Sequence, residues 1–191
     1  MILAVTLLLL GIFAGLARGG KLSNIGEIRF RLPGLVFVGL ALQVGAELFA
    51  AFNPAFRRGS VSLLVLAVSY AALIGFLVVN RQLPGTLFMG AGLGLNLLVI
   101  LLNNGMPVSL RASRAAGIAV ANYLEGAIKH VEMGPETKLG FLGDVLPLPI
   151  FGLVVSVGDL VLGIGMFVLV DRLVRYDPRR RAARRRLSGI R

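Results

Sequence analysis

Most of this chain consists of apolar segments that are long enough to cross a lipid bilayer. A membrane-spanning helix needs about 20 consecutive, mainly apolar residues. Hydrophobic residues make up 57% of the chain and charged residues only 15%, which is unlike the balance of a soluble domain. The sequence therefore predicts an all-α, polytopic membrane protein with five transmembrane helices. The predicted spans cover residues 1–17, 33–52, 61–79, 84–102 and 149–170, and an outer loop covers residues 103–148.

The basic side chains are divided unequally between the two sides that these spans define. The segments 17–32 and 77–84 and the tail after the last span fall on one side and hold most of the 20 Lys and Arg residues. Because basic residues are enriched in short cytoplasmic loops, we expect the N-terminus outside and the C-terminus inside. No basic residue precedes the first apolar run, whereas Arg18 and Lys21 follow it, so an uncleaved span is favoured over a signal peptide. The expected location is the bacterial cytoplasmic (inner) membrane.

The last residues differ in composition from the rest of the chain. Residues 1–175 are predicted to form the transmembrane domain, and residues 176–191 an Arg-rich cytoplasmic tail. Beside a membrane span, such a tail is typical of binding to anionic lipid headgroups, worth about 1 kcal/mol per basic residue. Nucleic-acid binding is the less favoured interpretation, and no nucleic-acid partner is expected. The arginines expected to anchor the tail to lipid are Arg179, Arg180, Arg181, Arg184, Arg185 and Arg186.

The outer loop contains a stripe of apolar residues at helical spacing, from Leu110 to Val131. Charged side chains such as Arg114 and Lys129 lie off this stripe. The pattern predicts an amphipathic helix at the bilayer surface or at the mouth of the bundle. A lid over an outward-facing cavity and a plain surface helix both fit it.

A few polar side chains lie inside the predicted spans, where ionisable groups are costly and usually face a partner or a cavity. At a rise of about 1.5 Å per residue, Glu47, Asn96 and Asp159 are expected at similar depths, and Gln43 shares a helix face with Glu47. One hypothesis is a polar mid-membrane pocket, open outward, in which these four residues bind a proton, a cation or an amine. The alternative is that the carboxyl groups are neutral and hold helices together through hydrogen bonds to groups such as Ser69. No basic residue falls inside a span, so an ion pair with Lys or Arg is not expected there.

The chain has no Cys and a single His, His130. This count excludes disulfides, iron–sulfur clusters, thiolate-ligated haem and His-rich zinc sites, and no Gly-rich nucleotide-binding loop is present. We expect neither a metal nor a cofactor. His130 is expected to be a loop residue on the surface, although pairing with Glu132 or Asp144 would allow a proton relay.

Three short sequence segments resemble a bacterial integral-membrane family that is known only as a domain of unknown function. They are Arg18-Gly19-Gly20-Lys21-Leu22, Asn103-Asn104-Gly105-Met106-Pro107-Val108-Ser109, and Leu142-Gly143-Asp144 leading to Ser156-Val157-Gly158-Asp159. The resemblance covers most of the chain except the Arg-rich tail, and it implies the membrane architecture without an activity. Asn103, Asn104 and His130 are the candidate functional residues of the outer loop.

Residues 156–163 are also similar to the last-span motif of lipoprotein signal peptidase, in which an Asp precedes an apolar, Gly-containing helix. The resemblance implies that Asp159 pairs with an upstream Asp, here Asp144, and that the two share a proton and activate water. The sequence departs from that enzyme because Asp144 lacks the Asn and Arg that frame its counterpart. The separation of the two Asp residues is also shorter.

Catalytic groups are scarce, whereas small residues suited to close helix packing are common. Gly11 and Gly15, and likewise Gly90 and Gly94, share a helix face, which predicts tight packing inside the bundle. The favoured function is a non-enzymatic binding or accessory subunit of a membrane complex, or a small transporter, with lipids and other membrane subunits as partners. The alternative is an intramembrane aspartyl hydrolase that acts near the outer face.

Overall fold

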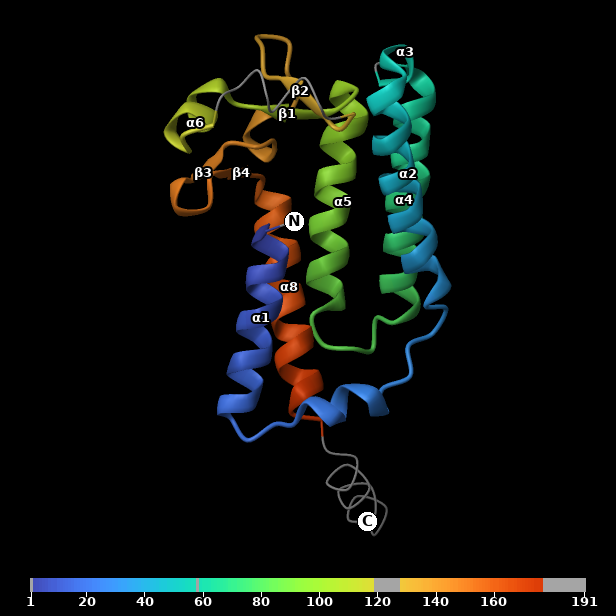
Figure 1. Cartoon of the computed structure of the whole chain (residues 1–191), viewed down its shortest axis with the longest axis vertical. Coiled ribbons are helices and arrows are strands. Elements are labelled where there is room, and N and C mark those ends of the chain that lie inside the picture. Colours follow the sequence, from blue (N-terminus) through green and yellow to red (C-terminus); the bar gives the residue numbers. More distant parts are fainter. Residues whose placement is uncertain (1, 58, 119–127, 177–191) are drawn as a thin grey trace.

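The computed structural model describes residues 2–57, 59–118 and 128–176. This described part is mostly helical, and its five long helices run roughly along the longest axis of the molecule (Figure 1). The largest helix contacts join α1 to α8, α8 to α5, α5 to α4 and α4 to α2, so the helices pack in that order. Their bounds are α1 Ile2–Ala17, α2 Gly34–Phe52, α4 Ser60–Val79, α5 Thr86–Asn103 and α8 Val157–Val174.

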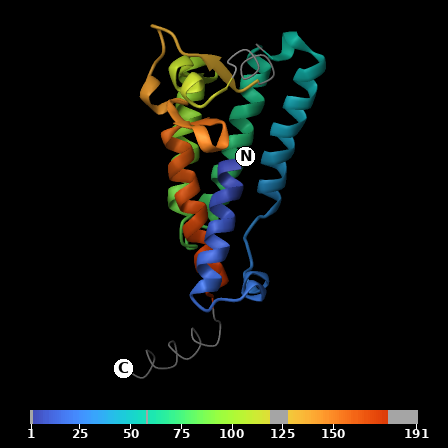
Figure 2. The same ribbon diagram turned by 60° about the vertical axis from the view of Figure 1, so that its left-hand side comes forward.

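The two ends of the bundle differ in the secondary-structure elements that lie there (Figure 1). At one end, which we call the tail end, α1, α4 and α8 finish and the 3-10 helix η1 (Leu22–Glu27) leads toward α2. At the other end, the sheet end, lie the short helices α3 (Pro54–Arg57) and α6 (Leu110–Ala115) together with the strands. Figure 2 shows the same separation from another side. The two basic linkers that the sequence analysis assigned to one side thus share the tail end.

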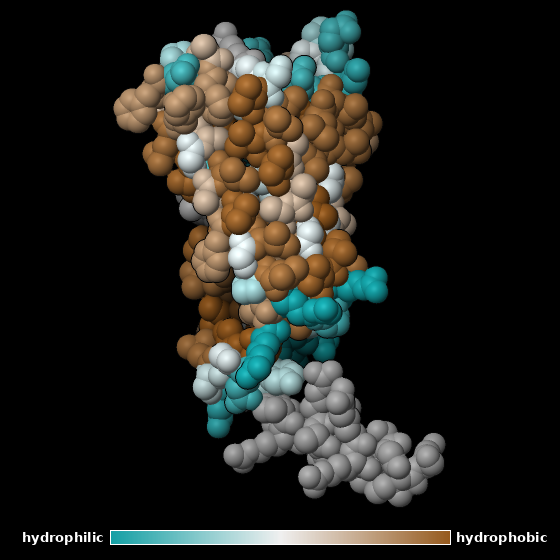
Figure 3. All heavy atoms as spheres, turned by 90° about the vertical axis from the view of Figure 1, so that its right-hand side faces the viewer, coloured by the Kyte–Doolittle hydropathy of each residue, from teal (hydrophilic) through white to brown (hydrophobic). Residues whose placement is uncertain are grey.

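The outer surface of the helices is apolar. In the described residues, α2, α4 and α5 are long and apolar enough to cross a membrane, and residues 5–17 of α1 form a shorter apolar helix. Large side chains on α2 face outward, and Phe37 is 72% and Phe52 89% exposed. Figure 3 shows hydrophobic atoms over the middle of the face that α2 and α4 form, and hydrophilic atoms at the tail end. Exposed side chains of this kind are typical of a surface that contacts lipid.

The outer loop folds into short strands, which the prediction of an all-α class missed. In the described part of this loop, β1 (Met106–Val108) pairs in parallel with β2 (His130–Glu132). The strands β3 (Leu146–Leu148) and β4 (Leu153–Val155) form an antiparallel hairpin, and the 3-10 helices η2 (Gly140–Leu142) and η3 (Pro149–Phe151) complete the segment. Pro147 and Pro149 favour this extended and turning backbone because proline cannot continue a helical hydrogen-bond pattern.

The last helix begins later than the sequence analysis predicted. The predicted span started at residue 149, but α8 starts at Val157, after the β3–β4 hairpin. Ser156 is its N-cap, and the side chains of Ser156 and Asp159 each accept a hydrogen bond from the other residue's backbone N–H. Such a capping box fixes the first turn of a helix. Asp159 therefore lies in the first turn of α8 instead of in the middle of a helix, and it lies level with Asn96 of α5, as predicted, because the two side chains are hydrogen-bonded.

The predicted amphipathic helix is shorter than its apolar stripe. Helix α6 ends at Ala115, and Gly117 has a positive φ of 73°, a conformation that favours glycine and ends a helix. Val131, the last residue of the stripe, lies in β2. Residues 119–127 lie outside the described residues.

Glycines on α1 allow close contact with α8. A Cβ atom at Gly11 would lie 2.9 Å from the Phe167 carbonyl oxygen, and one at Gly15 would lie 2.8 Å from Val174 Cβ. The predicted internal packing role is confirmed for this pair. It is wrong for Gly90, which has open space around its Cβ position.

Polar contacts at the tail end fasten α1 and its linker to α8. The buried Asp171 carboxylate accepts a hydrogen bond from Arg18 at 3.1 Å and is also ion-paired with Arg175. Asn24 Nδ2 and the Lys21 backbone N–H donate to the Val174 carbonyl oxygen at 2.8 and 2.9 Å. These contacts fix the relative position of the first and last helices.

Candidate functional site

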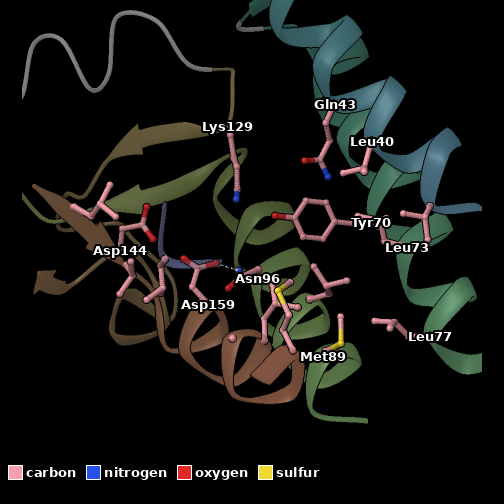
Figure 4. Close-up of a pocket in the computed structure, with 18 of the residues that line it drawn as sticks. Leu40, Gln43, Tyr70, Leu73, Leu77, Met89, Asn96, Lys129, Asp144 and Asp159 are labelled. Atoms are coloured by element: carbon pink, nitrogen blue, oxygen red, sulfur yellow. Dashed lines mark hydrogen bonds between the residues drawn. The ribbon is translucent and has the colours of Figure 1, made fainter. Parts of the chain in front are cut away.

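A cavity of about 540 Å³ lies within the bundle and reaches the sheet end (Figure 4). Its walls come from α1, α2, α4, α5, α8 and the folded outer loop. The apolar part of the cavity is lined mainly by Val36, Leu40, Leu73, Phe76, Leu77, Met89, Leu93, Leu162 and Met166. The polar side chains that line it are Gln43, Tyr70, Asn96, Lys129, His130, Asp144 and Asp159.

Asp159 belongs to a hydrogen-bond network between α5 and α8. Asn96 Nδ2 donates to Asp159 Oδ1 at 2.8 Å, and the Ser156 hydroxyl donates to Asn96 Oδ1 at 2.9 Å. The second carboxylate oxygen, Oδ2, accepts from the Ser156 backbone N–H at 3.1 Å. Asn96 and Ser156 are buried, so the network holds the carboxylate in a fixed position at the cavity wall.

Asp144 reaches the same cavity from the outer loop. Its backbone N–H donates to the Pro107 carbonyl oxygen at 2.8 Å, and its own carbonyl oxygen accepts from Ser109 at 3.0 Å. The carboxylate is buried, and Oδ2 lies 3.4 Å from His130 Nε2. His130 therefore pairs with Asp144, one of the two partners that the sequence analysis considered, instead of lying free on the surface. Figure 4 shows the Asp144 and Asp159 carboxylates turned toward one space.

Lys129 brings a cation to these two carboxylates. Its side chain extends from the outer loop into the cavity beside the Tyr70 hydroxyl, and Nζ lies 5.7 Å from the Tyr70 ring centroid. Burial lowers the pKa of the ammonium, but Tyr70, Asp159 and Asp144 outweigh this effect and raise the pKa above its usual value. Lys129 therefore stays protonated at neutral pH. No ion pair with Lys or Arg was expected inside the spans; Lys129 comes from outside the spans and acts on these carboxylates without a close ion pair.

The other polar residues predicted from the spans separate into two groups. Gln43 lines the cavity, and its Nε2 donates to the Ser69 hydroxyl at 2.9 Å, which in turn donates to the Gly39 carbonyl oxygen. Glu47, one turn further along α2, does not line the cavity. Beyond Gln43 the contact between α2 and α4 is closed by an apolar cluster that includes Ala46.

The remaining candidates lie away from the cavity. Asn103 Nδ2 donates to the carbonyl oxygens of Val99 and Lys138, each at 2.9 Å, and thereby fastens the outer loop to α5. Asn104 caps α5 in a left-handed conformation with φ 54°. Both residues shape the backbone at the end of α5. The arginines at 179–186 lie outside the described residues.

Sequence reasoning missed Lys129, Tyr70 and Ser156 as a group around Asp159. Ser156 had a usable signal, because Ser-x-x-Asp before an apolar run is typical of a capping box. Lys129 had no such signal, since its position depends on the long-range pairing of β1 with β2.

Among the described residues, no group of three or more His, Asp or Glu side chains is placed to hold a metal ion.

Comparisons with known proteins identify a family without assigning an activity. The chain matches no curated protein and no solved structure. A model described as "Family of unknown function (DUF5317)" matches residues 27–171, from the end of η1 to Asp171. The resemblance to an uncharacterised family is thus confirmed, and the chain belongs to the DUF5317 family of unknown function.

Proposed function

We propose that this protein is a multi-pass membrane protein that binds a small amphiphile in the cavity between α2, α4, α5 and α8. It would act as a binding subunit of a membrane assembly or as a small transporter. The observation that carries the proposal is the composition of the cavity wall. One continuous space joins a cluster of charged and hydrogen-bonding groups to a stretch lined by aliphatic side chains and Phe76.

The dimensions of the cavity suit a head group with an apolar chain. Its volume of about 540 Å³ falls within the range of about 300–1,000 Å³ that is usual for ligand sites. Along α4 the wall extends from Tyr70 at the polar end to Leu77, a rise of roughly 10 Å. An alkyl chain of moderate length fits this stretch while its polar end meets Lys129, Asp144 and Asp159.

The order of helix packing supports access from the lipid phase. Helices α1 and α2 stand at the two ends of the packing order, and Leu3 of α1 and Val36 of α2 both line the cavity. A ligand dissolved in the bilayer would reach the apolar wall between these helices.

The same proposal includes five spans, with the sheet end outside and the tail end in the cytoplasm. In α8 the charged residues lie in the first and last turns, at Asp159, Asp171 and Arg172, so its middle is uncharged. Helix α1 packs along α8. Both helices would therefore cross a bacterial inner membrane with the other three, and the Arg-rich tail would contact anionic lipids.

Cysteine labelling tests this orientation because the native chain has no Cys. A membrane-impermeant maleimide added to intact cells should label Glu136→Cys, an exposed site between β2 and η2 at the sheet end. It should not label Ser23→Cys, an exposed site in η1 at the tail end. Labelling of both sites after membrane permeabilisation is the control. The opposite pattern on intact cells would show that the orientation is inverted.

Ligand binding can be measured with a single fluorescent reporter, since the chain has no Trp. Phe76→Trp places a reporter in the apolar part of the cavity, and Phe37→Trp places one on the exposed face of α2. In maltoside micelles, an alkanol brominated at its chain end should quench the Phe76→Trp emission saturably, and unbrominated alkanol should reverse the quenching. The Phe37→Trp protein should show only weak, linear quenching. Equal, linear quenching in both proteins would contradict the proposed cavity binding.

A second candidate function is the intramembrane aspartyl hydrolase, which is favoured by the shared exposure of Asp144 and Asp159 to one cavity. One carboxylate would take a proton from water as the water oxygen attacks a carbonyl carbon, and the other would protonate the leaving group. Lys129 argues against it, because an ammonium near two carboxylates stabilises both in the ionised form. Cleaved ester or peptide recovered with the protein, absent from Asp159→Asn protein, would favour the hydrolase over binding alone.

A further inference from the structure

We infer that the amphiphile bound in this cavity carries a cationic amine as its head group. This inference rests on the proposed function and adds the chemical class of the ligand. It follows from the charges that meet at the polar end of the cavity. Two carboxyl side chains, Asp144 and Asp159, meet one lysine, Lys129, at this end of the cavity, so the acidic side chains outnumber the lysine by one.

Among the described residues, the groups that donate hydrogen bonds to Asp159 are neutral, and Lys129 acts on this carboxylate from a longer distance. These donors belong to Asn96 and Ser156, whereas Asp144 has His130 at 3.4 Å. The N-terminus of α8 offsets only about half of the Asp159 charge. Buried charges are stable only when paired and hydrogen-bonded, so a second cation at this position is electrostatically favoured.

Lys129 leaves room for that cation. Among the described residues, Asp171 forms ion pairs with two arginines, and Asp144 lies against the His130 imidazole. Lys129 is thus attracted to both cavity carboxylates without forming a close ion pair with either. A primary ammonium group has three donors, which suits the Asp159 carboxylate together with the oxygens of Tyr70 and Gln43 on the facing helices.

An anionic head group fits the same cluster less well. It would gain attraction from Lys129 alone and would meet two carboxylates of its own sign. A neutral hydroxyl head group would form hydrogen bonds without changing the charge balance. The predicted order of affinity is therefore amine, then alcohol, then carboxylate.

A series of three ligands with the same chain tests this order in the Phe76→Trp protein. The probes are ω-bromoundecylamine, ω-bromoundecanol and ω-bromoundecanoate in maltoside micelles at neutral pH, where the amine is protonated and the acid ionised. We expect the amine to half-saturate quenching at a concentration about tenfold lower than the alcohol, and the carboxylate to be the weakest. Saturable quenching by the alcohol without preference for the amine would overturn the amine assignment and leave amphiphile binding intact. Absence of saturable quenching by all three would instead contradict the proposed function.

Charge variants give a second, independent readout. Asp159→Asn keeps a hydrogen-bonding side chain but removes one negative charge, and should reduce the preference for amine over alcohol about tenfold. Lys129→Gln removes the positive charge and should increase that preference. Glu47→Gln, a change of charge outside the cavity on α2, is the matched control and should leave the preference unchanged. If Lys129→Gln lowers the preference for amine, the inference is wrong even where Asp159→Asn protein is too unstable to purify.

Discussion

Replacement of Gly92 by alanine is expected to destabilise the protein by about 3 kcal/mol, at the upper end of the usual cost of overpacking. Gly92 lies in α5 where it contacts α8, and a Cβ atom there would lie 2.4 Å from the Gly158 carbonyl oxygen and 2.6 Å from the Leu162 backbone nitrogen. Both are backbone atoms of α8, so the clash can be relieved only if the two helices move apart. Such a movement would also separate Asn96 from Asp159.

Gly90→Ala is the matched control, two residues earlier on the same helix. Its Cβ position has no atom of another element within 4 Å, and alanine is favoured over glycine in a helix by up to about 1 kcal/mol. Unfolding by SDS in mixed micelles, followed by helical circular dichroism, measures both variants against the unaltered chain. Equal stability of Gly92→Ala and Gly90→Ala would mean that α5 and α8 are not in close contact.

Asn96→Leu is expected to cost about 3 kcal/mol, because it leaves buried polar groups without their partners. Leucine has no group that donates to Asp159 Oδ1 or accepts from the Ser156 hydroxyl, the two bonds that Asn96 makes at 2.8 and 2.9 Å. The loss should weaken the first turn of α8 and displace the Asp159 carboxylate from the cavity wall. The amine preference of the cavity should fall with it.

Asn103→Ala provides the comparison at a less buried asparagine. Asn103 also makes several hydrogen bonds, but those to Lys138 are exposed to solvent, so water can replace them and the expected cost is about 1 kcal/mol. The same SDS titration gives both values. A cost for Asn96→Leu no larger than that for Asn103→Ala would show that the network around Asp159 does not hold α5 and α8 together.

The long helices could be predicted because hydropathy over about 20 residues is a local property of the chain. The start of α8 could not be found in this way, since the apolar run continues without interruption through the β3–β4 hairpin. Pro147, Pro149 and the capping pair Ser156 and Asp159 carry the information that places the helix start. A hydropathy average over a whole span does not detect the effect of these four residues on where the helix begins.

The candidate site was predicted in part. Gln43, Asn96 and Asp159 were found because polar residues in apolar spans usually face a cavity or a partner, and Asp144 was found through a local resemblance. Glu47 was predicted to share the pocket but does not line the cavity, because an apolar cluster that includes Ala46 closes the contact between α2 and α4 beyond Gln43. Lys129 was missed because the outer loop folds back through pairing between distant segments, which no local pattern reveals.

Native mass spectrometry of the unaltered chain, released from membranes in a mild detergent, tests whether the protein carries an amphiphile in this cavity. We expect a peak for the chain with one bound amphiphile. That peak should persist in Leu48→Trp, a change on the exposed face of α2, and disappear in Leu40→Trp, which fills part of the cavity from the same helix. An unliganded chain in all three preparations, or a bound molecule retained equally by all three, would contradict the claim that this cavity is the binding site.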